Sequence, residues 1–172
     1  MRTITLLIVF LSVFSVHSQE VSKNIQIISE EDVPFQVLEL HQELYPFNLV
    51  SEWQLHRENR NLDSAPLRYI GTIATDGNSK SSASYSENGV LLFMSEIIPP
   101  MTIPQDIDLD IKKKHPDFKI QTAELVTLAH PKKEIYWINL INEGMLQYVF
   151  YDSYGNEIEK QDLPLELMVL FR

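Results

Sequence analysis

The side chains that could perform covalent chemistry lie far apart in this sequence. A nucleophilic hydrolase needs a serine or cysteine beside a base and an oxyanion donor. The chain has no cysteine and no G-x-S-x-G turn, and Ser81, Ser82 and Ser84 stand in a polar stretch typical of a solvated strand face. We predict no catalytic residue and expect a protein that is not an enzyme, although an enzyme of unrecognised type stays an alternative.

Metal-binding patterns are incomplete in the sequence. The histidines that could be ligands lack H-x-H or H-E-x-x-H spacing: His41, His56, His115 and His130. Asp106, Asp108 and Asp110 resemble the start of a calcium loop, but the glycine and the trailing glutamate of such a loop are missing. They fit the first turns of a helix that ends at Lys112-Lys113-Lys114, because these charges favour the two ends of a helix dipole. We therefore predict no metal site and no cofactor.

Aromatic side chains are the best candidates for recognition. In two predicted strands, residues 134–141 and 145–151, alternation directs Tyr136 and Tyr151 toward a core. Their neighbours then lie on the opposite, open face, and these are the predicted binding residues: Trp137, Asn139, Tyr148 and Phe150. Exposed aromatic residues mark recognition sites because they bury much area at little entropic cost. Two alternatives stay open, in which the C-terminal tail or a second subunit covers this face.

A duplicated pattern organises the elements that would position these residues. Val33-Pro34-x-x-Val37 and Tyr45-Pro46 are matched by Ile103-Pro104-x-x-Ile107 and His115-Pro116. In each half the prolines enclose apolar residues at helical spacing. Strand-like runs follow, at residues 49–55, 67–73, 81–85 and 90–97 and then at 119–128, 134–141, 145–151 and 157–160. The predicted fold class is α+β, a tandem repeat of a helix plus a four-stranded antiparallel meander.

The two ends of the chain differ from this pattern. Residues 1–18 combine Arg2, an apolar run and small residues, which is typical of a secretory signal peptide and too short to span a bilayer. An exported protein without cysteine fits the periplasm or cell envelope of a Gram-negative bacterium. The predicted organisation is a signal peptide (1–18), a lead-in (19–32), two repeats (33–101 and 102–162) and an apolar tail packed on the core (163–172).

The duplicated motifs resemble the PepSY-like secreted proteins of the Bacteroidetes. The resemblance rests on helices that end in Tyr-Pro or His-Pro, on a Tyr-bearing strand and on an aromatic-Asp-x-x-Gly hairpin. It implies a fold similar to the β-lactamase inhibitor protein, with helices packed on one face of a curved sheet, and a role in binding proteins or restraining peptidases. His41 and Ser86 depart from the family pattern, and residues 61–66 look like an insertion.

Charge narrows the class of partner. The chain has 24 acidic residues against 14 lysines and arginines, an excess that repels nucleic acid and anionic membrane surfaces. Our hypothesis is an exported binding module that holds a protein or peptide on the open face of its sheet and does not insert into a membrane after signal cleavage. The alternative is a structural envelope protein that self-associates, for example as a homodimer, through the same aromatic face.

Overall fold

The computed structural model describes residues 25–57, 66–74 and 80–168. The predicted signal peptide and residues 169–172 of the predicted tail lie outside the described residues. The strands are β1 (Ile25–Ile28), β2 (Val50–Arg57), β3 (Leu67–Ala74), β4 (Lys80–Ser86), β5 (Leu91–Ile98), β6 (Lys119–Leu128), β7 (Lys133–Asn142) and β8 (Met145–Asp152). The α-helices are α1 (Phe35–Leu44), α2 (Gln105–Lys114) and α3 (Leu165–Met168), and short 3-10 turns lie at Glu30–Asp32, Pro100–Thr102 and Lys160–Asp162.

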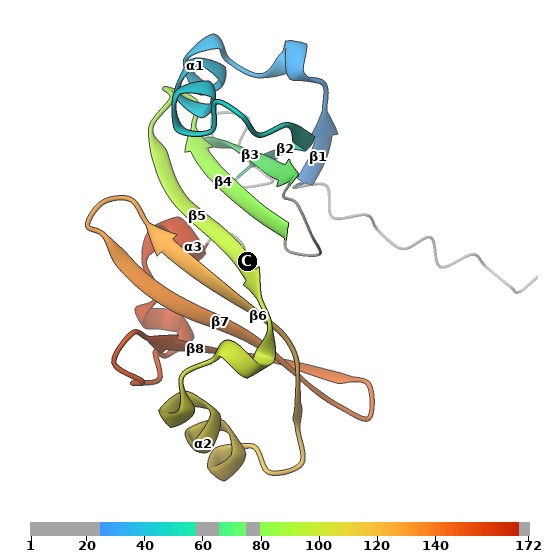
Figure 1. Ribbon diagram of the computed structural model, residues 1–172, viewed down its shortest axis with the longest axis vertical. Coiled ribbons are helices and arrows are strands. Elements are labelled where there is room, and N and C mark those ends of the chain that lie inside the picture. The colour runs from blue at the N-terminus through green and yellow to red at the C-terminus, as the bar shows by residue number, and fades with distance from the viewer. Residues whose placement is uncertain (1–24, 58–65, 75–79, 169–172) are drawn as a thin grey trace, which may run out of the picture.

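The described strands form one eight-stranded antiparallel sheet whose spatial order is the chain order, β1 to β8 (Figure 1). β5 and β6 pair directly, from Phe93 opposite Leu128 to Ile98 opposite Ala123. The fold is therefore a single large sheet with few helices, and the predicted tandem repeat of a helix plus a four-stranded meander is wrong.

The last strand predicted for the second repeat, residues 157–160, does not form. Glu157 makes an isolated bridge with Tyr151 before a 3-10 turn begins at Lys160. The segment has a single apolar residue, Ile158, so it offers no alternating face to bury. Glu157 instead pairs with Lys114 of α2, with 2.6 Å between the carboxylate oxygen and the ammonium nitrogen.

Helices pack on both faces of the sheet, which corrects the prediction that they share one face. Ile107 and Ile111 of α2 pack in one cluster with Val149 and Tyr151 of β8. The intervening residue, Phe150, points to the opposite face because side chains alternate along a strand, and it packs in the cluster that contains Leu167 of α3. Pairing across the strands places α1 on the same face as α2, near the other end of the sheet (Figure 1).

Helix α1 is amphipathic, and its first turn lies against the turn between β4 and β5. Val37 and His41, one helical turn apart, are its buried residues. The helix ends at Leu44 because the residue before a proline, here Tyr45 before Pro46, is disfavoured in the α conformation. Near its start, the turn between β4 and β5 lies so close that a Cβ atom on Gly89 would be 2.7 Å from the carbonyl oxygen of Gln36.

Within the described ranges, no helix combines the length and the apolar character needed to cross a membrane.

Candidate binding pocket beside helix α1

The four residues predicted to bind a partner lie together on one face of β7 and β8. Trp137 is directly opposite Phe150, and Asn139 is opposite Tyr148. The Trp137 ring lies 6.2 Å from the Tyr148 ring and 6.3 Å from the Phe150 ring, measured between centroids. The Asn139 amide donates a hydrogen bond to the Thr122 hydroxyl at 2.7 Å. The structure therefore brings the four predicted residues together as neighbouring side chains on one face.

The C-terminal residues cover part of this cluster. Phe150 is 3% exposed and packs with Leu163 and Leu167, and Trp137 is half-buried against the same group. Tyr148 is 48% exposed. The face is thus partly closed by residues 163–168, and its role in binding stays a prediction.

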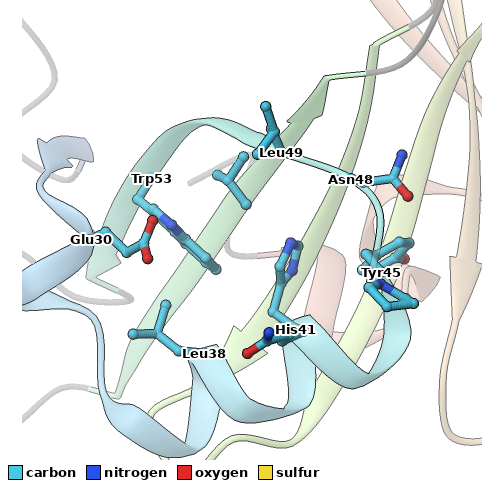
Figure 2. A pocket seen from close by; sticks show the side chains of 10 residues that line it. Glu30, Leu38, His41, Tyr45, Asn48, Leu49 and Trp53 are labelled. Atoms are coloured by element: carbon cyan, nitrogen blue, oxygen red, sulfur yellow. The ribbon is translucent and has the colours of Figure 1, made fainter.

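A pocket of about 310 Å³ lies elsewhere, between α1, the 3-10 turn before it and the start of β2 (Figure 2). We call it the α1–β2 pocket. Its lining residues are Glu30, Leu38, His41, Gln42, Tyr45, Pro46, Asn48, Leu49, Val50 and Trp53. Figure 2 shows His41 rising from α1 between Trp53 and Tyr45. Sequence analysis singled out His41 as a departure from the family pattern but did not predict the pocket.

The inner wall of the pocket is held in place by close packing. Trp53 packs flat enough on β3 that a Cβ atom on Gly71 would lie 3.0 Å from its ring. The His41 ring lies 5.2 Å from the Trp53 ring and 5.0 Å from the Tyr45 ring, between centroids. Because His41 and Trp53 are only 6% and 4% exposed, their positions are fixed by the fold.

Hydrogen bonding in this wall is incomplete. His41 Nδ1 lies 2.7 Å from the Tyr85 hydroxyl, a hydrogen bond between α1 and β4. His41 Nε2 and Trp53 Nε1 are both buried and have no hydrogen-bond partner within the part of the chain that the structure describes. A buried polar group without a partner costs about 1–3 kcal/mol, so two such groups at one pocket call for an explanation.

Electrostatics favour a neutral imidazole at this position. Burial lowers the pKa of His41, and the negative charge of Glu30 opposes that shift. Burial also raises the pKa of Tyr85, so its hydroxyl keeps the proton at neutral pH. The wall is therefore uncharged, and Glu30 is the one acidic residue among the described residues that line this pocket.

The outer rim of the pocket is apolar and exposed. Leu49, which lines the pocket, is 80% exposed, and Phe47, in the same loop but outside the lining, is 95% exposed. Exposed apolar groups beside a pocket are typical of interaction sites. The run Tyr45-Pro46-Phe47-Asn48-Leu49 was the available sequence signal, because it is too apolar for an ordinary connecting loop.

The residues considered for metal binding have other surroundings. No group of three or more histidine, aspartate or glutamate side chains suited to a metal ion occurs among residues 25–57, 66–74 and 80–168. Asp106 and Asp108 lie in the first turn of α2, as expected from their charge. Asp110 accepts a hydrogen bond from Tyr151 at 2.9 Å and pairs with Lys114 at 2.8 Å, contacts that lower its pKa and attach α2 to β8.

No family model matches this chain, and no curated protein matches it. Among solved structures, the chain is similar to one from Bacteroides thetaiotaomicron, provisionally described as a calcium-regulated periplasmic protein, with 16% identity and a TM-score of 0.35 over 78% of this chain and 94% of that one. It is also similar to a protein from Bacteroides vulgatus, provisionally described as a periplasmic member of the DUF2874 family, with 17% identity and a TM-score of 0.35 over 80% of this chain and 97% of that one. Both similar structures are thus described as periplasmic, and the resemblance to PepSY-like proteins stays a prediction.

Proposed function

We propose that this chain is an exported, non-enzymatic binding protein that holds an extended segment of a protein or peptide at the α1–β2 pocket. The observation that carries the proposal is the meeting of two buried nitrogen atoms without partners and an exposed apolar rim. Export to the periplasm or envelope is supported by the signal-like residues 1–18.

The energetics suit a moderate affinity. Covering an exposed side chain such as Leu49 or Phe47 yields about 1.5–3 kcal/mol. Providing a partner for a buried nitrogen recovers up to about 1–3 kcal/mol. Association and ordering oppose these terms, so we expect a peptide to bind with a Kd in the micromolar range, corresponding to about −8 kcal/mol.

The acidity of the chain indicates which peptides fit best. With 24 acidic residues against 14 basic ones, and Glu30 at the pocket, the surface favours a neutral or basic segment over an acidic one. Holding a segment of this kind would also suit the restraint of a peptidase, the role that the PepSY-like resemblance implies.

A second candidate is binding or self-association through the aromatic cluster of β7 and β8. It is favoured by the exposure of Met145, Leu146 and Tyr148, at 59%, 55% and 48%, beside the hairpin of these strands. Because Phe150 is buried, Tyr148 and the hairpin would have to carry such contacts.

Selection from a displayed library of random peptides tests the two candidates. The mature chain should enrich neutral or basic peptides, and fluorescence anisotropy should show weaker binding to Leu49→Ser. Met101→Ser is the matched control, because Met101 is 90% exposed but lies in the turn before α2. If Tyr148→Ser abolishes binding while Leu49→Ser leaves it intact, the binding site is the sheet face and the proposal for the pocket is wrong.

A further inference from the structure

The hydrogen-bond pattern around Tyr85 fixes the tautomer of His41. The Tyr85 side chain is 0% exposed, and His41 Nδ1 is the only hydrogen-bond partner of its hydroxyl among the described residues. If Nδ1 carried the hydrogen, the Tyr85 O–H would be a buried donor without an acceptor and His41 Nε2 a buried acceptor without a donor, whereas hydrogen on Nε2 leaves a single unpaired group. The hydroxyl therefore donates to Nδ1, and the neutral imidazole carries its hydrogen on Nε2.

Both unpartnered nitrogen atoms are consequently hydrogen-bond donors. The indole Nε1 of Trp53 is a donor in every state, and Nε2 of His41 is a donor in this tautomer. The two rings lie in a T-shaped arrangement, 5.2 Å apart between centroids, and both line the α1–β2 pocket. A group that satisfies them must supply acceptor atoms, and a carbonyl oxygen has two lone pairs for this purpose.

We propose that the α1–β2 pocket recognises a neutral carbonyl group, of the kind carried by a peptide main chain, through the N–H groups of His41 and Trp53. This inference rests on the proposed function and names the ligand chemistry of the same pocket. Leu49 at the rim then covers the apolar side chain that flanks the carbonyl. Gln42 and Asn48 also line the pocket, and their amide oxygens can accept the N–H of the same amide group.

The charge of the pocket selects against a carboxylate. Glu30 lines the pocket, and its field reaches the imidazole, because it opposes the fall in the pKa of His41. No lysine or arginine is among the described lining residues, so an anionic ligand would meet the acidic side chain of Glu30 and no full positive charge from these residues. A neutral amide avoids this repulsion and still offers the acceptor oxygen.

Isovaleramide and isovalerate form a matched pair of probes, because they share the same branched carbon chain and differ in charge. The readout is the indole N–H resonance of Trp53 in the mature protein, followed by nitrogen–proton NMR at neutral pH. The chain has two tryptophans, and Trp137 lies on the opposite face of the sheet, so its resonance is an internal reference. We expect isovaleramide to shift the Trp53 resonance saturably, with an affinity at least about tenfold higher than that of isovalerate, a ratio equal to about 1.4 kcal/mol.

The variant Glu30→Gln tests the role of charge without disturbing the buried wall, because Glu30 is exposed. It should strengthen isovalerate binding and leave isovaleramide binding unchanged, whereas Glu31→Gln, beside it in the same exposed turn but outside the pocket, should change neither. Equal or tighter binding of isovalerate to the unmodified protein would overturn the preference for a neutral carbonyl. If neither probe moves the Trp53 resonance while selected peptides still require Leu49, the carbonyl inference fails and the proposed function stands.

Discussion

A side chain added at Gly89 should weaken the attachment of α1 to the sheet. Gly89 lies in the turn between β4 and β5 with φ +74°, and a Cβ atom there would be 2.7 Å from the carbonyl oxygen of Gln36 and 2.8 Å from its Cβ. Both distances are below the 3.0 Å that Cβ atoms keep from other heavy atoms. Gly89→Ala therefore combines backbone strain with a collision against the first turn of the helix that carries His41.

Gly144 separates these two effects. It also has a positive φ, +87°, but a Cβ atom there would meet no atom of the described residues within 4 Å. An alanine in this backbone region costs roughly 1–2 kcal/mol, and the loss of freedom in the unfolded chain returns about 0.4–1 kcal/mol. Gly144→Ala should thus lower the free energy of unfolding by about 1 kcal/mol. The collision adds about 1–3 kcal/mol at Gly89, for a total of about 2–4 kcal/mol.

Urea unfolding measures the difference directly. With a slope of about 2 kcal/mol per molar urea, the unfolding midpoint of Gly89→Ala should lie about 1 M below that of Gly144→Ala. The Gly89 variant should also bind selected peptides more weakly, because α1 moves relative to Trp53. Midpoints that agree within about 0.2 M would refute the argument that this turn holds α1 in place.

Three further predictions concern the buried side chains. Phe150→Ala should lower the free energy of unfolding by about 3–5 kcal/mol in urea titrations, whereas Tyr148→Ala, at a half-exposed site, should cost less than about 1 kcal/mol; equal losses would show that Phe150 is not part of the core. Tyr85→Phe should cost about 1–3 kcal/mol, since it leaves His41 Nδ1 buried without a partner, and an unchanged stability would show that this hydrogen bond does not hold α1 to β4. The lowered pKa values of His41 and His56 mean that the unfolded chain binds more protons, so the free energy of unfolding should fall as the pH drops below about 6.5, and His41→Gln should make this fall shallower.

The sequence predicted the individual elements well because their signals are local. Prolines and apolar spacing located α1 and α2, and alternation located the strands from β2 to β8 to within one or two residues. Which strand edges meet is not a local property. The pairing of β5 with β6, which merges the halves into one sheet, joins residues as distant in the sequence as Phe93 and Leu128, and no local alternation specifies it.

The same distinction applies to the candidate sites. Alternation assigned Tyr151 and Phe150 to opposite faces, but it could not show that Leu163 and Leu167 cover the second of these. The α1–β2 pocket was beyond sequence reasoning for a related reason. His41 and Tyr85 are 44 residues apart, and only the packing of α1 on the sheet brings them within hydrogen-bond distance.

A comparison with helix α2 shows that His41 is an unusual residue for its buried position in α1. Both helices have ten residues and bury two side chains one turn apart, Val37 and His41 in α1 but Ile107 and Ile111 in α2. Isoleucine at the second position packs at 2% exposure and leaves no polar atom to satisfy. The histidine at the matching position of α1 introduces a buried N–H group that has no partner among the described residues. Residues that weaken a fold without improving its packing are concentrated at functional sites. His41 is such a residue, because its unpaired N–H lies beside an exposed apolar rim. Because His41→Ile alone would leave the buried Tyr85 hydroxyl without an acceptor, the test is the double variant His41→Ile/Tyr85→Phe. If His41 served packing alone, this variant would leave peptide binding intact; we expect it to fold and to lose binding.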